Sequence, residues 1–310
     1  GGVTEDSATV ASGTLTVTDT DTSESKFTAP LASSLIGTYG AFTFNATTGE
    51  WTYAVDNTKS VVQALGAGKT ATDTLTVTSY DGTVSKTITA TVTGVNDVPT
   101  ITGTSTGSVT EDKATKATGT LTVSDADTGE ALFATPTTSS LTGSYGSFTF
   151  NATTGAWTYT VDSTKSAVQA LGASSTLTDS LTVTSYDGTV SKTITATVTG
   201  VNDVPTITGT STGGVTEDSA AVASGTLTVT DTDTGESLFK TPTTSSLTGS
   251  YGSFTFNATT GAWTYAVDNT KSVVQALGAG KTATDTLTVT SYDGTVSKTI
   301  TATVTGVNDV

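Results

Sequence analysis

The chain has 310 residues and a formal net charge of −16; its 12 basic residues are all lysines, and it contains no His, Cys or Met. This composition excludes histidine general bases, catalytic thiols, disulfides and metal sites built on thiolate or imidazole ligands. The acidic charge disfavours binding to nucleic acid and to anionic membrane surfaces.

Three near-identical repeats make up the chain. Trp51, Trp157 and Trp263 are spaced by 106 residues each. This period is well above the roughly 20–50 residues of solenoid repeats, so it predicts complete domains in tandem. The segment GVNDVP marks each joint, and we expect three domains at residues 1–98, 99–204 and 205–310. Both chain ends fall in register with the period, so we also expect a segment of a longer protein, with a first repeat that lacks its opening residues.

Alternating apolar residues and turn signals mark seven strands in the middle repeat, at the spacing of roughly 8–12 residues typical of a β-sandwich. Threonine, about a quarter of the chain, favours this all-β assignment because a β-branched polar residue suits the wet face of a strand. In chain order the predicted strands cover residues 100–111, 117–124, 131–135, 145–151, 156–162, 177–186 and 189–200. YDGT joins the last two as an Asp-Gly hairpin. The fold class is therefore three tandem seven-stranded β-sandwiches of immunoglobulin type, in an elongated rod of about 120 Å.

The alternation also predicts which side chains fill the sandwich. The predicted core of the middle repeat comprises Leu121, Val123, Phe148, Phe150, Trp157, Tyr159, Val161, Leu181, Val183, Ile194, Ala196 and Val198. The tryptophans are expected to be buried. An aromatic platform that stacks on sugars is the alternative interpretation of Trp51, Trp157 and Trp263.

The direction of each strand places the acidic loops. If the first strand leaves the linker at one end of the module, its end TED (residues 110–112) lies at the far end, and the second strand returns. The loop SDADTGE (residues 124–130) therefore faces the preceding linker. Asp162 lies at the far end, where the last strand runs out into the next linker. Each joint thus gathers acidic side chains from both neighbouring repeats.

The candidate metal ligands form one set at each joint. The first set is Glu5, Asp6, Asp56, Asn96, Asp97, Asp125, Asp127 and Glu130. The second set is Glu111, Asp112, Asp162, Asn202, Asp203, Asp231, Asp233 and Glu236. Two carboxylates about 4 Å apart near a surface repel by roughly 4 kcal/mol at an effective dielectric constant of about 20, so seven together require a cation. Calcium, which takes roughly six to eight oxygen ligands in flexible geometry, fits better than magnesium. A solvated acidic turn is the alternative.

The outer ends of the chain carry half-sets, which we expect to bind calcium more weakly. Asp19, Asp21 and Glu24 lack a preceding linker, and the second half-set is Glu217, Asp218, Asp268, Asn308 and Asp309. TSE replaces TGE in the first repeat, so the loop around Glu24 is expected to differ from its counterparts. Asp81, Asp187 and Asp293 are expected to be turn residues rather than ligands.

Motifs in all three repeats resemble the VCBS repeat, a cadherin-like module of very large bacterial surface adhesins, often of the RTX type. They are VTED, GTLTVTDTDTGE, YGSFTFNATTGAWTY, VQALGAG, DTLTVTSYDGT and GVNDVP. NDVP followed by DTDTGE also resembles the cadherin pattern, in which an Asn-Asp linker and a downstream Asp-x-Asp pair hold calcium between domains. The resemblance implies a cadherin-like sandwich and calcium ligands at Asn96, Asp97, Asp125 and Asp127, then at Asn202, Asp203, Asp231 and Asp233. Asp56 and Asp162 occupy the place of cadherin's acidic segment without its second acid.

The resemblance implies a mechanical role rather than catalysis. We expect calcium-rigidified extender repeats of a secreted bacterial adhesin, located at the cell surface, that project a terminal binding domain for adhesion and biofilm formation. The alternatives are an array of carbohydrate- or protein-binding modules and a subunit of a self-assembling extracellular fibre. The expected partners are the neighbouring repeats of the same chain, with no nucleic acid and no membrane insertion; the distal ligand is not identifiable. Serine and threonine have no histidine partner, so enzyme function is not expected.

Overall fold

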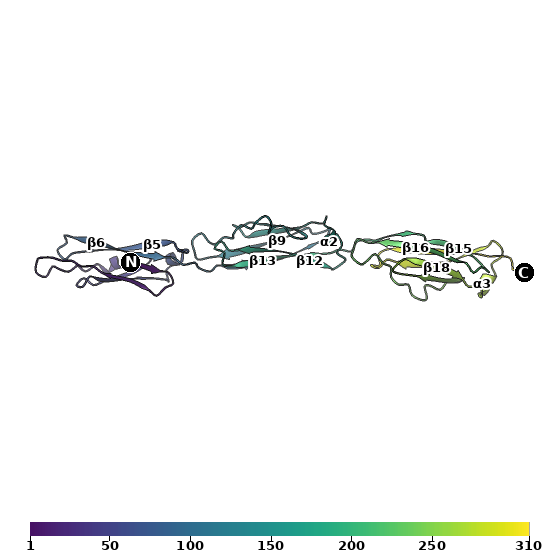
Figure 1. The fold of residues 1–310 in the computed structure, drawn as a ribbon, viewed down its shortest axis with the longest axis horizontal. Helices are drawn as coiled ribbons and strands as arrows, with labels where there is room; N and C mark the ends of the chain where they lie inside the picture. Colours follow the sequence, from purple (N-terminus) through teal and green to yellow (C-terminus); the bar gives the residue numbers. More distant parts are fainter. Residues whose placement is uncertain (310) are drawn as a thin grey trace.

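The computed structural model describes residues 1–309; Val310, the last residue of the predicted third repeat, lies outside the described residues. The fold is nearly all β, with three two-sheet modules arranged end to end along one long axis (Figure 1). This arrangement confirms the predicted fold class of tandem sandwiches in an elongated rod. No helix in residues 1–309 is long and apolar enough to span a membrane.

The strands of each module pair only with strands of the same module. The first module contains β1 (Gly2–Thr4), β2 (Val10–Thr14), η1 (Ala32–Leu35), β3 (Gly40–Phe44), β4 (Glu50–Val55), α1 (Ser60–Gln63), β5 (Thr70–Thr78) and β6 (Ser85–Thr93). The second contains β7 (Thr100–Gly103), β8 (Thr106–Thr110), β9 (Lys116–Ser124), β10 (Gly146–Phe150), β11 (Ala156–Val161), α2 (Ser166–Gln169), β12 (Thr176–Thr184) and β13 (Ser191–Thr199). The third contains β14 (Thr206–Gly209), β15 (Thr212–Thr216), β16 (Val222–Thr230), β17 (Gly252–Phe256), β18 (Ala262–Val267), α3 (Ser272–Gln275), β19 (Thr282–Thr290) and β20 (Ser297–Thr305).

Each complete module packs a four-stranded sheet on a three-stranded sheet. In the second module the strand orders are β10-β11-β9-β7 and β12-β13-β8. The third module repeats this topology, whereas the described part of the first has the three-stranded orders β2-β4-β3 and β1-β6-β5. The predicted boundaries at 98/99 and 204/205 fall in the segments between β6 and β7 and between β13 and β14, and they stay predictions.

Two of the predicted strands are wrong in detail. The segment 100–111 is two strands, because the chain crosses from one sheet to the other: β7 pairs antiparallel with β9, and β8 pairs parallel with β13. The segment 131–135 forms only an isolated bridge between Phe133 and Ser185. Phe133 is buried, whereas its neighbours are not. This stretch therefore contributes one side chain to the core without forming a strand of either sheet.

The core follows the predicted alternation. Every predicted core residue of the second module is buried except Phe150, which is partly buried against the same cluster. Trp51, Trp157 and Trp263 are buried, as expected from the pattern. The aromatic platform for sugars is therefore not formed by these residues.

A buried aspartate joins the two sheets of each module. In the third module the Asp285 carboxylate on β19 accepts hydrogen bonds from the backbone N–H groups of Ser250, Tyr251 and Gly252 at 2.8, 2.9 and 3.0 Å. It also accepts one from the Tyr265 hydroxyl on β18, in the opposite sheet, at 2.7 Å. Burial and this hydrogen bond raise the pKa of Tyr265 well above its usual value. Asp73 and Asp179 make matching contacts in the other modules.

Candidate metal centres at the joints between modules

Parallel pairing brings the first acidic residue of each module to its own outgoing linker. Because β1 runs parallel to β6, both strands end at the same edge, where Glu5 follows β1 and the linker follows β6. The Glu5 backbone N–H donates to the Thr93 carbonyl at 2.9 Å. Its buried carboxylate accepts from the Val95 N–H at 3.1 Å. The strand-direction argument thus placed Glu5 correctly.

The loop that follows β9 reaches back from the second module onto this linker. The Asp97 N–H donates to Asp127 Oδ2 at 2.9 Å, and the Asp127 N–H donates to Asp125 Oδ1 at 3.0 Å. The Thr128 N–H donates to the carbonyl of Ala64, which follows α1 in the first module, at 3.1 Å. Acidic groups of both modules therefore meet at the joint.

The second joint reproduces the first. Asp203 donates its N–H to Asp233 Oδ2 at 2.9 Å, and Asp233 donates to Asp231 Oδ1 at 3.0 Å. Thr234 donates to the Ala170 carbonyl at 3.1 Å, and Glu111 Oε2 accepts from Val201 N–H at 3.3 Å. Two joints built from the same contacts identify one recurring arrangement.

Buried carboxylate oxygens without hydrogen-bond partners mark both joints. At the first joint they are Asp97 Oδ2, Asp125 Oδ2 and Asp127 Oδ1. At the second they are Asp231 Oδ2 and Asp233 Oδ1. A buried anionic oxygen without a partner is costly, by about 1–3 kcal/mol or more. Such oxygens are hard anionic donors of the kind that calcium prefers, so the residues present fit this ion.

The carboxylates of each joint also influence one another's protonation. Burial raises the pKa of Asp97 above its usual value, and the charges of Asp127, Asp6 and Asp125 raise it further. Burial likewise raises the pKa of Glu130, with Asp127 and Asp125 as the next causes. These pKa shifts have the direction expected where carboxylates converge in a partly buried site.

Glu5 and Asp6 are bridged by a glutamine that the sequence analysis did not select. Gln63 on α1 donates from Nε2 to Glu5 Oε1 at 3.2 Å and to Asp6 Oδ1 at 3.1 Å. Gln169 makes the same pair of contacts with Glu111 and Asp112. A neutral amide satisfies one oxygen of each acid but adds no compensating charge. The sequence signal was the recurring glutamine of VQALG.

Asp56 and Asp162 are engaged in local hydrogen bonds within their own turns. The Asp56 carboxylate accepts from the Thr58 hydroxyl at 2.6 Å and from its N–H at 3.1 Å, which lowers the pKa of Asp56. Asp162 makes the same bonds with Thr164. Only the neighbouring Asn57 reaches the acidic cluster, where its Oδ1 accepts from the Asp6 N–H at 3.2 Å. The two aspartates therefore cap the turn before the short helix.

The side-chain amide of Asn96 contacts Asp187, for which the sequence predicts a role in a turn rather than as a metal ligand. Asn96 Nδ2 donates to the Asp97 carbonyl at 2.6 Å and to Asp187 Oδ2 at 3.0 Å. Asp187 does hold the YDGT turn, through Ser185 and Thr189. Burial opposes its ionisation, but these hydrogen bonds hold the pKa of Asp187 at about 2. Asn202 and Asp293 repeat the contact. Because the strand before YDGT runs toward the preceding linker, strand direction alone could have placed this turn at the joint.

A further acidic group lies in the loop after β2 of the first module. Within the described residues, Asp19, Asp21 and Glu24 form a group whose carboxylate oxygens lie within 4.8 Å of one another, a spacing suited to a shared cation. The carboxylates at the two internal joints do not reach this spacing. Ser23 adopts a left-handed φ of 72°, close to the 86° of Gly129 and Gly235. The backbone at Ser23 thus resembles that of its counterparts, whereas the spacing of the carboxylates in this loop differs from theirs.

Several solved structures of cadherin extracellular regions are similar to the chain at low sequence identity. Among solved structures, the protocadherin GammaB4 extracellular domain is 18% identical with a TM-score of 0.41, and the match covers 92% of this chain but 43% of that one. Mouse clustered PcdhgC3 EC1-3 is 17% identical over 86% of each chain, with a TM-score of 0.36. Drosophila N-cadherin EC1-3 is 13% identical over 100% of this chain and 97% of that one, with a TM-score of 0.32.

The family assignment rests on sequence rather than on these distant superpositions. No curated protein matches the chain. The bacterial cadherin-like domain family matches residues 96–200 and again residues 202–306, which together make up more than half of the chain. The chain therefore belongs to the bacterial cadherin-like domain family, of which it carries tandem copies.

Proposed function

We propose that the chain is a calcium-stiffened spacer from a secreted bacterial surface adhesin, built from extender modules of the VCBS type. The observation that carries this proposal is the pair of joints with buried, unpartnered carboxylate oxygens. An extender must resist bending at the places where its modules meet, and these are the places where the uncompensated charge lies. Each module has its own sheets and its own hydrophobic core, so we expect the modules to fold without the ion.

At each joint, residues from three segments would hold the ion. At the first joint these are Glu5 after β1, Asp97 in the linker, and the loop after β9 with Asp125, Asp127 and Glu130. When bound, calcium supplies the positive charge that this cluster lacks. The chain's own contribution is to bring the carboxylates together from both modules, so that binding stabilises one relative orientation. The matching second set is Glu111, Asp203, Asp231, Asp233 and Glu236.

The spacer role accounts for the near-identity of the repeats better than a binding array does. A binding array would present a recognition surface, and the tryptophans that could have formed one are buried. Location at the cell surface follows from the calcium requirement, because extracellular modules bind calcium at about 10⁻⁴–10⁻³ M, which demands a calcium-rich medium. On this proposal the terminal domain of the adhesin, rather than these modules, carries adhesion and biofilm formation.

Calcium titration of the whole chain by calorimetry tests the proposal. The wild-type chain should release or absorb heat with a midpoint in the submillimolar to millimolar range. The double variant Asp125→Ala, Asp127→Ala should lose the ions of one joint, while Glu50→Gln, a charge change on an exposed hairpin, should bind as wild type does. Failure of the wild type to bind calcium, or an unchanged stoichiometry in the double variant, would overturn the proposal.

A further inference from the structure

The loop that follows the short helix of each module carries a lysine at the first joint and a serine at the second. Between α1 and β5 the loop reads Gly-Ala-Gly-Lys at residues 66–69, whereas between α2 and β12 it reads Gly-Ala-Ser-Ser at residues 172–175. The third repeat has Gly-Ala-Gly-Lys again, at residues 278–281. Lys69 therefore has Ser175 as its counterpart at the second joint.

The backbone of this loop is the same at both joints. The Lys69 N–H donates to the Gly66 carbonyl at 2.9 Å, and the Lys69 carbonyl accepts from the Gly94 N–H at 2.8 Å. Ser175 makes the matching two bonds within its own module, at 3.0 and 2.9 Å. The two loops therefore differ in a side chain and its charge rather than in the course of the chain.

A glutamate of the following module packs against this loop. A Cβ at Gly66 would lie 3.0 Å from Glu130 Oε1. At the second joint a Cβ at Gly172 would lie 2.9 Å from Glu236 Oε1. Both glutamates are half-buried. In both joints the carboxylate of the next module thus lies beside the loop whose last residue differs.

Ser175 and Glu236 line one hollow at the second joint. The hollow has a volume of about 480 Å³ and lies between the two modules. Ser175, Glu236 and Thr234 supply its polar side chains, and the other six lining residues are alanine, leucine or glycine. A lysine in place of Ser175 would therefore have room to place its ammonium group beside the Glu236 carboxylate.

The charges that act on the two glutamates match this difference. Burial is the largest cause that raises the pKa of Glu130, three aspartates add to it, and Lys69 opposes them. Burial and three aspartates also raise the pKa of Glu236, and every cause there acts in the same direction. Lys69 thus supplies positive charge to a cluster of carboxylates that includes buried oxygens without hydrogen-bond partners.

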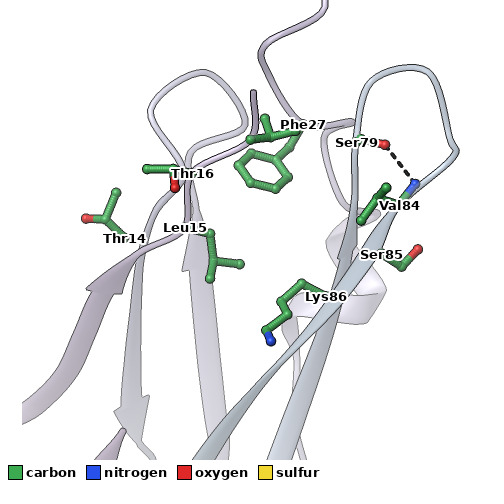
Figure 2. A pocket seen from close by; sticks show the side chains of 9 residues that line it. Thr14, Leu15, Thr16, Phe27, Ser79, Val84, Ser85 and Lys86 are labelled. Carbon is green, nitrogen blue, oxygen red and sulfur yellow. Dashed lines mark hydrogen bonds between the residues drawn. The ribbon is translucent and has the colours of Figure 1, made fainter. Parts of the chain in front are cut away.

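Lysines that recur in every repeat cannot distinguish the two joints. Lys86 lies on β6, next to the turn in which the Val84 N–H donates to Ser79 Oγ at 3.0 Å (Figure 2), and all three repeats have a lysine at this position. Lys59 also recurs, and its ammonium group donates to the Gly37 carbonyl of its own module at 2.9 Å. The difference between the joints therefore concerns Lys69 rather than these lysines.

We propose that the residue at this loop position, Lys69 or Ser175, sets how strongly each joint depends on calcium. Lys69 is a tethered counter-charge for the carboxylates of the first joint. This joint therefore binds calcium more weakly but keeps more of its stiffness without the ion. The second joint, with Ser175, binds calcium more tightly and loosens more when the ion is removed. The inference rests on the proposed function, because it takes the joints to be calcium sites.

The test exchanges the two residues in the full chain and follows each joint separately. Spin labels at Thr72→Cys and Ser191→Cys report on the first joint, and labels at Thr178→Cys and Ser297→Cys report on the second. All four positions are exposed, and the chain has no cysteine of its own. Distances between the labels are recorded during a calcium titration and in chelator.

In the wild type the first joint should need about three- to tenfold more calcium than the second, because one ammonium charge repels a divalent ion near the surface. The factor is modest because Lys69 is exposed. Lys69→Ser should strengthen calcium binding at the first joint by this factor and broaden its distances in chelator, whereas Lys69→Arg, which keeps the charge, should behave as the wild type does. Ser175→Lys should have the reverse effects at the second joint. High salt should shrink these differences, which a purely structural role would not produce.

Three substitutions taken from the other repeats serve as controls. Ser174→Gly introduces the residue of the first and third repeats at a position whose φ of 69° matches the 71° of Gly68. Lys113→Ser and Lys240→Ala replace lysines that occur in one repeat only with a residue found at the same position in another repeat. All three should leave the calcium midpoint of the second joint within about twofold of the wild type, since charges exposed to solvent are screened.

The outcomes separate this inference from the proposed function. Normal calcium binding by the wild type, with unchanged midpoints and distances in both exchange variants, would overturn the inference and leave the proposed function standing. Absence of calcium binding by the wild type would overturn both. An effect of Ser174→Gly as large as that of Ser175→Lys would assign the difference to the loop backbone and would also overturn the inference.

Discussion

The Asp285 carboxylate joins the two sheets of the third module, through three backbone N–H groups and one tyrosine hydroxyl. Hydrogen bonds to a charged group contribute about 1.5–3 kcal/mol each when a partner is removed. The site is fully supplied with donors, unlike the carboxylates at the joints. Acidic residues in this chain therefore fall into two physical classes, one satisfied by the protein and one not.

Replacing this aspartate should destabilise its module. We expect Asp285→Asn to lower the free energy of unfolding of the third module by about 2–4 kcal/mol, because an amide nitrogen would face N–H donors. Urea unfolding followed at the Trp263 indole resonance measures the effect. Tyr265→Phe removes one bond and should cost less. Thr286→Ala, on the exposed face of the same strand, should change stability by less than about 0.5 kcal/mol, and a loss of comparable size there would contradict the assignment.

The raised pKa values at the joints predict competition between protons and calcium. Burial raises the pKa of Glu111, and Asp112, Asp203 and Asp233 add to the shift against a hydrogen bond from Val201. The pKa of Glu111 is higher in the folded protein than in the unfolded chain. Its carboxyl group therefore favours the folded state most at low pH, where it is protonated, and this stabilisation is lost as the pH rises through the folded pKa. Calcium needs the ionised form, so its affinity should fall as the pH drops from 7.5 toward 4.5. Calorimetric titrations across this range check the trend, and a constant affinity would contradict it.

At the scale of elements, the crossing from the first strand of a complete module to its second (β7 to β8, and β14 to β15) depends on the backbone conformation of one glycine. Gly209, at the same point in the third module, has a φ of 102° and lies against the Thr226 carbonyl, 2.3 Å from where a Cβ would be. An alanine there must shift the strand or strain the backbone. The pairing of β14 with β16 therefore depends on the absence of a side chain at Gly209.

Gly209→Ala should therefore release β14 from β16. We expect a loss of about 1–3 kcal/mol in the stability of the third module, with faster hydrogen exchange along β14. Gly214→Ser is the matched control, because a Cβ at Gly214 meets nothing closer than 3.6 Å and the second repeat carries Ser108 at this position. Equal destabilisation by the two substitutions would show that the conformation of Gly209 is not the cause.

Alternation in the sequence predicted the long strands and almost the whole core, because each apolar residue that faces inward is separated from the next by a polar one. It could not predict the break inside residues 100–111, since a strand that changes sheets keeps its alternation. It also assigned a strand to 131–135, where one buried Phe133 mimics a strand pattern. Strand direction placed Glu5, Asp97 and the loop after β9 together, but not the local hydrogen bonds that occupy Asp56.

At the scale of the whole molecule, several hydrogen bonds cross each joint. At the first joint they include the Thr128 N–H to the Ala64 carbonyl, the Asp97 N–H to Asp127, and Asn96 to Asp187. Repulsion among the remaining carboxylates is screened only beyond about 8 Å at physiological salt. The shape of the rod should therefore depend on calcium more than the fold of its modules does.

Removal of calcium should loosen the rod without unfolding it. Small-angle scattering should report a long, stiff particle in millimolar calcium and a broader ensemble with chelator. Far-ultraviolet circular dichroism should remain β-rich in both, because the module cores contain no joint residues. An unchanged maximum dimension and rigidity in chelator would mean that the acidic loops serve only as a solvated surface.

Flexibility should be assignable to a single joint. Asp125→Ala with Asp127→Ala should loosen the first joint in calcium and leave the second stiff, as measured by spin-label distances across each joint. Asp231→Ala with Asp233→Ala is the reciprocal control and should have the reverse effect. Loosening of both joints by either double variant would contradict independent sites.

The two joints share their contacts, down to the 2.9 Å bond between the linker aspartate and the loop of the next module. Identical contacts imply one rotation and one translation from each module to the next, and repetition of a single such step generates a screw axis. A longer array of these repeats would therefore coil as a regular helix, in which every module presents its faces at a fixed angular increment. A change in one linker would alter the rotation between the two modules that it joins. All modules beyond it would then face a different direction around the long axis.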